Sequence, residues 1–180
     1  MENQNYPSGK HSFTYGLVAG IILIFISLLF YILDLNPYEH KWSGFINYVA
    51  LLAGIVISAI HYRDKHCGGY INYGKSLSVG FLTGLIASII VGIYTYFFMR
   101  FLGDEIRQIA LDQAEEKIYE QIADPTDEQI NATIKVTKFF LKSWMSAITA
   151  FVIYTFFSLI FALIASIFIK KEDKSLEANV

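Results

Sequence analysis

The sequence predicts an all-α membrane protein with four transmembrane helices and a long extramembrane helical hairpin between the third and the fourth. Of its 180 residues, 54% are hydrophobic and 17% are charged, whereas soluble domains carry about 25% charged residues. The charges lie mostly outside four long apolar segments, and the connection between the last two segments has a helical pattern of its own. We therefore interpret the whole chain (1–180) as a single integral membrane domain.

The four apolar segments predict the transmembrane helices. They cover about 13–33, 44–62, 76–98 and 143–169, and each is long enough to cross a hydrocarbon core of ~30 Å. Backbone groups in lipid must be hydrogen-bonded within the segment, so we expect helices. The first segment exceeds the roughly 7–15 apolar residues of a signal peptide and is expected to be retained. Four spans place both termini on the same side of the membrane.

The connection from about 101 to 141 predicts the hairpin. Structureless loops beyond ~12–15 residues are uncommon, and apolar residues recur here every four positions. Pro125 ends one helix, and Thr126 with Gln129 fits a capping box that begins the next. We predict that the third and fourth helices continue past the membrane and meet at Pro125, in a hairpin standing off the outer face.

The apolar stripe of this hairpin either seals the two arms together or lies on the lipid surface. The connection contains nine acidic and four basic residues. Since helices that lie on anionic lipid are rich in Lys and Arg, this balance favours the sealed hairpin with an acidic exterior.

The basic residues leave the orientation of the chain open. With both termini cytoplasmic, the inner side carries seven basic residues and the outer side also carries seven. Basic residues in short cytoplasmic flanks determine orientation most strongly. The inner set lies entirely in short flanks, at Lys10, Arg63, Lys65, Lys75, Lys170, Lys171 and Lys174. We therefore expect cytoplasmic termini.

Small residues recur at helical spacing on the predicted spans. Such residues let helix backbones approach closely in lipid, either within one bundle or between two copies of a chain. We favour packing within the bundle and keep an oligomer face as the alternative. The residues are Gly16, Gly20, Gly54, Ser76, Gly80, Gly84, Ser88 and Gly92.

The loop between the second and third spans is the most unusual short stretch. Gly68-Gly69 marks a turn, Tyr70 and Tyr73 suit the headgroup zone, and Lys75 could meet lipid phosphate. We favour a short interfacial segment, with a loop that docks a partner as the alternative.

The sequence contains no pattern typical of an enzyme, a cofactor site or a nucleic-acid site. The net charge is near zero without a basic tract, so no nucleic-acid partner is indicated. His61, His66 and Cys67, with Asp64 between them, are possible metal ligands, but a structural zinc site has four ligands at recognisable spacing and no fourth ligand is evident here. We expect no metal, no cofactor and no catalytic residues.

Several short motifs, taken in order, resemble a known family. Tyr15 to Gly20 opens the first span, and Gly69 to Leu77 followed by Val79-Gly80 opens the third. An acidic helical insert interrupted by Asp124-Pro125 comes next, and Leu163 to Phe168 with Lys170-Lys171 ends the last span. The chain resembles the bacterial membrane proteins grouped as domain-of-unknown-function family 4199. The resemblance implies a four-span protein of a bacterial inner membrane and brings no activity or site residues.

The function that these observations favour is a non-enzymatic accessory or scaffold component of the inner membrane, acting through the hairpin or the small-residue faces. Its expected partners are the lipid bilayer and either another membrane protein or further copies of the chain. The alternative is a small oligomeric transporter or channel. Ionisable residues near mid-membrane and prolines within spans, both common in transporters, are missing from the sequence.

Overall fold

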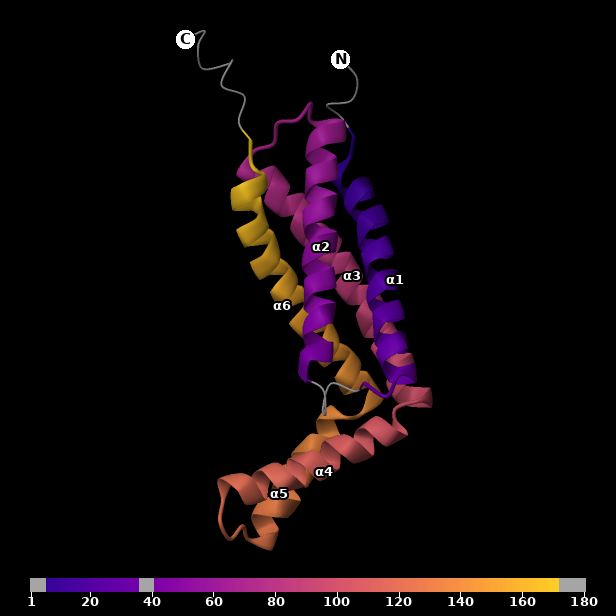
Figure 1. Cartoon of the computed structure of the whole chain (residues 1–180), viewed down its shortest axis with the longest axis vertical. Coiled ribbons are helices and arrows are strands. Elements are labelled where there is room, and N and C mark those ends of the chain that lie inside the picture. The colour runs from indigo at the N-terminus through magenta and orange to yellow at the C-terminus, as the bar shows by residue number, and fades with distance from the viewer. Residues whose placement is uncertain (1–5, 36–40, 172–180) are drawn as a thin grey trace.

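The structure is all-helical over the residues that it describes, 6–35 and 41–171, in a computed structural model of the chain. Four long helices form a bundle: α1 (Ser8–Ile32), α2 (Lys41–His66), α3 (Tyr73–Phe101) and α6 (Ser143–Ile169). Two shorter helices, α4 (Asp104–Gln121) and α5 (Asp127–Phe140), form a hairpin at one end of the bundle (Figure 1). The four bundle helices are long and apolar enough to cross a membrane. The predicted fold class is confirmed.

The bundle helices begin and end close to the predicted apolar segments. Helices α1, α2 and α3 each start before the apolar segment does, because polar first turns continue the helical backbone outside the hydrocarbon region. The start of α3 is fixed by Asn72, whose side chain accepts a hydrogen bond of 2.8 Å from the backbone N–H of Lys75. This N-cap satisfies one of the backbone donors that a helix leaves unpaired at its first turn.

Helix α3 is the centre of the bundle, since the two most extensive helix contacts are those it makes with α6 and with α1. Its small residues allow this close approach. Gly84 lies directly against Ser158 of α6, and Gly80 lies between Ile55 of α2 and Ala162 of α6. On the facing side, a Cβ atom at Gly16 of α1 would lie 2.7 Å from the backbone oxygen of Thr83. The helix backbones therefore approach too closely for larger side chains at these positions.

The interior of the bundle is filled with side chains. Leu51, Ile55, Val79, Ala87 and Ala162 are 0% exposed. Buried hydroxyl groups mostly bond within or between adjacent helices, as in the 2.7 Å hydrogen bond between Ser58 and Thr83. Most of these buried hydroxyl groups are therefore paired within the protein, as a helix interior in lipid requires, whereas Ser76 and Thr155 have buried hydroxyls without a partner in the described part of the chain.

The first and last described residues lie at the same end of the bundle (Figure 1). The hydroxyl of Tyr62 donates a hydrogen bond of 2.9 Å to the backbone oxygen of Tyr6. Ile71 and Lys171 exchange two backbone hydrogen bonds of 2.9 Å in an isolated antiparallel bridge. The loop before α3 and the end of α6 are thereby joined at this end, which we call the termini end.

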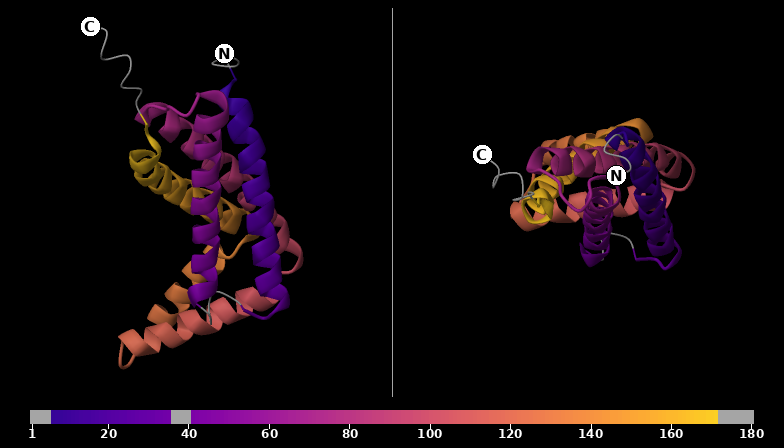
Figure 2. Two further views of the ribbon diagram at one scale, coloured as in Figure 1. Left: turned by 45° about the horizontal axis from the view of Figure 1, so that its top comes forward. Right: turned by 90° about the horizontal axis from the view of Figure 1, so that it is seen from above.

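The hairpin differs from the prediction in how it leaves the membrane. The prediction that helices continue unbroken from the third and fourth spans into the hairpin is wrong. The chain leaves helical geometry between α3 and α4 and again between α5 and α6, where Lys142 is extended with φ −60° and ψ 136°. Because of these two breaks, the hairpin runs obliquely across the end of the bundle instead of along the spans (Figures 1 and 2).

The tip of the hairpin agrees with the sequence analysis. The predicted capping box is confirmed, since Thr126 accepts from the backbone N–H of Gln129 and the Gln129 side chain accepts from the N–H of Thr126. Ala110 and Ile118 of α4 are buried, but none of the residues of α5, all of which the structure describes, is buried. The apolar stripe of the hairpin is therefore partly buried on α4, whereas on α5 its side chains remain at least partly exposed.

The close approach of α1 and α3 gives a first prediction. Replacing Gly16 with Ala places a Cβ atom against the backbone of Thr83, so the two helices must separate. Overpacking of this kind costs about 1–3 kcal/mol, and we expect Gly16→Ala to lower the midpoint of unfolding in a detergent titration.

The matched control is Gly9→Ala in the same helix, where an added Cβ atom meets nothing within 4 Å. This variant should unfold like the wild-type protein or slightly later, since Ala favours helix over Gly. Equal midpoints for the Gly16 and Gly9 variants would contradict the packing described here.

Candidate functional site

The junction between the hairpin and the bundle contains the most specific polar contacts of the molecule. Helix α3 ends at Phe101, and α4 begins at Asp104 after a turn through Gly103. A Cβ atom at Gly103 would lie 2.9 Å from the backbone oxygen of Met99. The turn therefore requires glycine because the chain folds back tightly against the last turn of α3.

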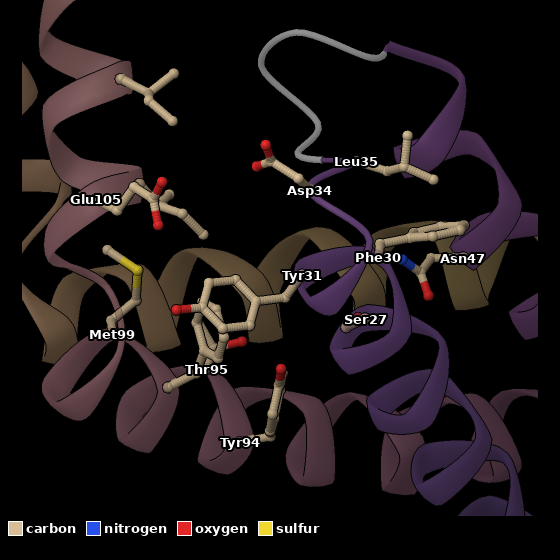
Figure 3. Close-up of a pocket in the computed structure, with 13 residues that line it drawn as sticks. Ser27, Phe30, Tyr31, Asp34, Leu35, Asn47, Tyr94, Thr95, Met99 and Glu105 are labelled. Carbon is tan, nitrogen blue, oxygen red and sulfur yellow. The ribbon is translucent and has the colours of Figure 1, made fainter.

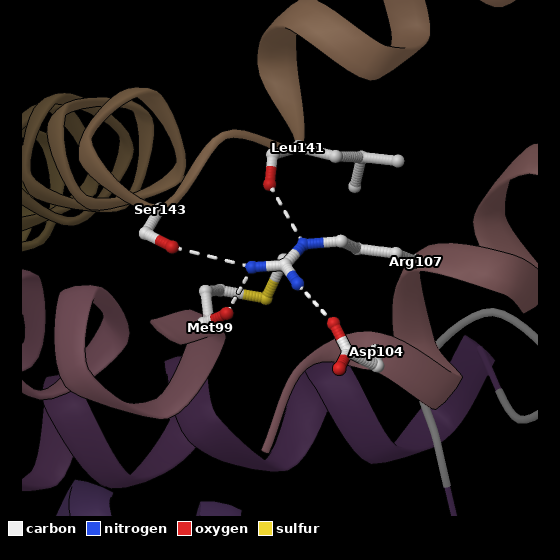
Figure 4. A network of polar contacts seen from close by, with 5 residues as sticks. All are labelled: Met99, Asp104, Arg107, Leu141 and Ser143. Atoms are coloured by element: carbon white, nitrogen blue, oxygen red, sulfur yellow. Dashed lines mark hydrogen bonds and ion pairs between the residues drawn. The ribbon is translucent and has the colours of Figure 1, made fainter. Parts of the chain in front are cut away.

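Arg107 of α4 joins three elements at this junction (Figure 4). Its Nη1 donates to the carboxylate of Asp104 one turn earlier, and its Nη2 donates to the backbone oxygen of Met99 and, at 3.2 Å, to the hydroxyl of Ser143. Its Nε donates to the backbone oxygen of Leu141 at 3.3 Å. One guanidinium group thus connects the end of α3, the end of α5 and the start of α6.

These contacts provide hydrogen-bond donors to backbone carbonyl groups at the helix ends. The last carbonyl groups of a helix have no partner within it, and Met99 and Leu141 supply such carbonyls at the ends of α3 and α5. The guanidinium group carries five N–H donors in a fixed planar arrangement, which a lysine cannot match. Below it, Met99, Ala110 and Leu141 form a small buried cluster. The junction is therefore both hydrogen-bonded and packed.

A cavity of about 210 Å³ lies beside this junction, between α1, α2, α3 and the first turns of α4 (Figure 3). The aromatic rings of Phe30, Tyr31, Tyr94 and Phe98 form much of its wall. Asn47 is 8% exposed, and its side-chain oxygen has no hydrogen-bond partner in the described part of the chain. The cavity combines an apolar wall with one unsatisfied polar atom.

Two carboxylates also line this cavity. Asp34 and Glu105 project on the same side of it (Figure 3). Asp34 is placed by the end of α1, where it adopts a left-handed backbone with φ +56°. The N–H of Leu35 donates to Phe30 and that of Asp34 to Tyr31, which is the Schellman arrangement usually built on glycine. The chain thus holds a carboxylate at the edge of the cavity in a strained backbone position.

The termini end of the bundle carries a cluster of aromatic and imidazole rings. His11 of α1 is 4% exposed, stacks on Tyr15, and its Nε2 lies 3.0 Å from the backbone oxygen of Ser58. The hydroxyl of Tyr15 is hydrogen-bonded to Nδ1 of His61. His66 stacks on Tyr6, at 4.2 Å between ring centroids. These contacts fasten the start of α1 to the end of α2.

The possible metal ligands of the sequence lie in this region. Asp64 is hydrogen-bonded to Arg63 next to it, and His61 and His66 are engaged with the two tyrosines. Burial raises the pKa of the Cys67 thiol, an effect that the nearby Lys75 ammonium partly offsets. Within residues 6–35 and 41–171, no three His, Cys, Asp or Glu side chains are grouped as metal ligands.

The predicted small-residue positions all lie inside the bundle. Gly16 and Gly20 face Ile86 and Ile90 of α3, Gly54 faces Ala19 of α1, and Gly92 faces Phe151 of α6. Ser76 and Ser88 are 0% exposed. Together with Gly80 and Gly84, these residues contact the chain's own helices and offer little surface to a second copy.

The predicted partner loop is tied largely to its own chain. Gly68 and Gly69 form a left-handed turn with φ +61° and +87°. The Tyr73 hydroxyl donates to the backbone oxygen of Leu163 at 3.4 Å, and Lys75 donates to Ser8 at 3.3 Å. Tyr70, 42% exposed, lies under the Lys171 ammonium group. The loop thus joins α3 to the beginning of α1 and to the end of α6.

Sequence reasoning missed the two features that define the hairpin end. No sequence pattern assigns a role to Arg107 or brings the cavity residues Asn47 and Tyr94 together. Their contacts come from four elements that are distant along the chain. The only local signal was Gly103 followed by two acidic residues, which is typical of a new helix start.

Comparison with known proteins assigns most of the chain to a family. Residues 14–171 match the model of a family described as "Protein of unknown function (DUF4199)". No curated protein and no solved structure matches the chain significantly.

The arrangement around Arg107 gives a second prediction. Arg107→Gln removes the donors that join α3, α5 and α6, and Arg107→Lys leaves one ammonium group that cannot reach all three. We expect both variants to loosen the hairpin, with about tenfold faster proteolysis at residues 102–103 and 141–142, which corresponds to roughly 1.4 kcal/mol of local stability.

The control is Lys117→Gln, at an exposed position of α4 away from the junction. It should be cleaved at the wild-type rate. If Arg107→Gln were also cleaved at that rate, the contacts of Arg107 would contribute nothing to the placement of the hairpin.

Proposed function

Because the chain belongs to the DUF4199 family, whose function is unknown, we propose that this integral membrane protein is a non-enzymatic accessory or scaffold component of a bacterial inner membrane. In this proposal the hairpin of α4 and α5 is the element that contacts a partner protein. The observation that carries it is the anchored hairpin: an extramembrane element fixed to the bundle by Arg107 with exposed apolar residues.

The surface of the hairpin supports this role. Tyr119 of α4 is 53% exposed, Ile122 at the tip is 36% exposed, and Val136 of α5 is 57% exposed. Large apolar residues on a fixed extramembrane element favour docking of another protein more than solvation. Because the hairpin is already held in place, a partner meets a surface that needs little further ordering on binding.

The interior of the bundle supports a scaffold more than a single-chain transporter. Its centre is filled by fully buried side chains such as Leu51, Ile55 and Val79. The hydroxyls of Thr83, Ser88 and Ser158 each donate to a backbone oxygen four residues earlier in their own helix. Transport would therefore require a path between several copies of the chain. An oligomeric channel or transporter of this kind is the alternative to the scaffold.

We also propose that the termini end faces the cytoplasm and the hairpin faces the opposite side. The basic residues of the termini end, which include Lys10, Arg63, Lys65 and Lys75, lie in short flanks of the spans. Basic residues in such flanks are retained on the cytoplasmic side during insertion.

Photo-crosslinking tests the scaffold proposal. A photoreactive amino acid at position 136 should give one discrete adduct with another membrane protein in native membranes, and that protein should co-purify with the full chain in fixed stoichiometry. The control is position 25, because Phe25 is 66% exposed on the membrane-spanning part of α1 and should react with lipid.

Two outcomes would contradict the scaffold proposal. Adducts between copies of the chain alone would indicate a homo-oligomer and favour a channel or transporter. Movement of a solute into vesicles by the purified, partner-free protein would show transport directly.

Thiol labelling tests the orientation. Cys67 is the single cysteine of the chain and lies at the termini end. In right-side-out vesicles a membrane-impermeant maleimide should not label Cys67, whereas it should label a cysteine at position 117 in the Cys67→Ser background. Inside-out vesicles should give the reverse pattern.

The labelling of Cys67 should also increase with pH. The thiolate is the reactive form, and burial raises the pKa of this thiol, so a smaller fraction is reactive at neutral pH than for an exposed cysteine. Labelling of Cys67 in inside-out vesicles should therefore be slow at pH 7 and well over tenfold faster at pH 8.5, because the thiolate fraction rises about tenfold for each pH unit below the pKa. Labelling of Cys67 from the outer side would reverse the proposed orientation.

A further inference from the structure

A basic groove lies at the base of the hairpin, distinct from the aromatic cavity. It has a volume of about 560 Å³ and lies among the ends of α3 and α5 and the starts of α4 and α6. Four of its side chains are positively charged, and among the described residues that line it there is no aspartate or glutamate. The lining residues are Tyr96, Arg100, Arg107, Leu111, Lys138, Leu141, Lys142, Ser143 and Trp144.

Three of these cations have no carboxylate partner among the described residues. The ion pairs of the described part of the chain are Arg63 with Asp64 and Arg107 with Asp104. Arg100, Lys138 and Lys142 are exposed and unpaired there, although Lys142 lies 5.5 Å from the ring centroid of Phe139. Like charges gathered in one groove repel each other, so a bound anion stabilises this arrangement.

The charge of the hairpin is divided along its length. All nine acidic residues lie between positions 104 and 128, whereas residues 129–143 contain three lysines and no acidic residue. The acidic part forms α4 and the tip, and the basic part is the segment of α5 that returns to the bundle. The net charge of the whole hairpin therefore does not describe the surface next to the membrane, which is formed by the basic part.

The groove lies at the ends of two candidate membrane spans, where lipid headgroups are expected. The span of α3 ends at Phe101 and that of α6 begins at Ser143. Tyr96 and Trp144, which are 40% and 48% exposed, belong to the residue types enriched at membrane interfaces. One turn further into the spans, Ile93 is 57% and Ile148 is 50% exposed, so apolar surface for acyl chains begins directly beside the charged groove.

We propose that this groove binds the phosphate group of an anionic phospholipid. Arg100, Lys138 and Lys142 supply charge-assisted hydrogen bonds to the phosphate oxygens, and the rings of Tyr96 and Trp144 cover the glycerol region. The acyl chains continue along the exposed faces of α3 and α6. A lipid bound in this way joins α5 to the end of α3 and the start of α6, the same elements that Arg107 connects from inside the junction.

A free phosphate ion fits this groove less well than a lipid does. A soluble anion would use the charges but not the aromatic and apolar surface that adjoins them. The site is proposed independently of any protein partner, because the residues that line it do not include the proposed docking residues, which are Tyr119 and Ile122 toward the tip and Val136 on α5.

Lipid binding to the full-length protein tests the proposal. Native mass spectrometry in detergent measures the dissociation constants of phosphatidylglycerol and phosphatidylcholine for the wild type and for four single variants. Three variants, Arg100→Gln, Lys138→Gln and Lys142→Gln, remove one charge from the groove each. The fourth, Lys117→Gln, removes one charge from α4 outside the groove and is the matched control.

We expect the wild-type protein to prefer phosphatidylglycerol and each groove variant to bind it about fivefold more weakly, the effect of one basic residue near an anionic membrane surface. The control should keep the wild-type preference. Unchanged thermal unfolding of the variants, measured alongside, separates loss of the lipid from loss of the fold.

Three results would overturn the proposal. The first is no preference of the wild type for the anionic lipid. The second is an equal loss for Lys117→Gln and the groove variants, which would show a net-charge effect without a site. The third is displacement of phosphatidylglycerol by millimolar inorganic phosphate, which would identify the groove as a site for a free anion. Retention of the lipid in phosphate supports the lipid as the ligand.

Discussion

The close approach of α3 to α1 and α6 is the constraint on which the rest of the structure depends. In lipid there is little hydrophobic gain in bringing helices together, so association depends on packing and on hydrogen bonds between helices. Gly84 against Ser158 and Gly16 against Thr83 bring the backbones together on two sides of α3. Helix α2 then packs over this layer with Leu51 and Ile55 fully buried. The small residues thus determine the bundle and leave its outer faces to the lipid.

The two ends of the bundle are held in different ways. At the termini end, rings and loops join neighbouring segments, as in the stacking of His66 on Tyr6 and the backbone bridge between Ile71 and Lys171. At the hairpin end, one guanidinium group satisfies carbonyls that two helices leave unpaired. The first arrangement closes the bundle, and the second fixes the direction of an element that leaves it. This difference is why we place the functional surface at the hairpin end.

The hairpin end carries several distinct surfaces within a short distance of the membrane. The aromatic cavity with Asp34 and Glu105 lies on the α1 side, whereas the basic groove with Arg100 and Lys142 lies on the side of α5 and α6. The exposed residues of the hairpin tip lie further out. A scaffold that must hold a fixed orientation relative to the bilayer gains from this combination, because lipid contacts at the base and the Arg107 contacts inside the junction act on the same elements.

The sequence by itself determined the number of spans, their positions and the existence of the hairpin. These follow from length and periodicity. An apolar run of about 20 residues crosses a bilayer as a helix, because its backbone groups must be hydrogen-bonded within the segment. Pro125 with Thr126 and Gln129 defines a turn and a helix cap from local sequence alone. The small residues could also be assigned to helix contacts, because their spacing places them on single faces.

Only the tertiary structure decided the direction of the hairpin and the composition of its sites. The direction in which the hairpin leaves the bundle depends on Gly103 and Arg107. The partners of Arg107 are eight to 36 residues away along the chain, at Met99, Leu141 and Ser143. The basic groove likewise collects Arg100 and Lys142 from the ends of different helices. Hydropathy and periodicity describe one segment at a time, whereas these sites arise where the ends of several segments meet, and that meeting depends on how the helices pack.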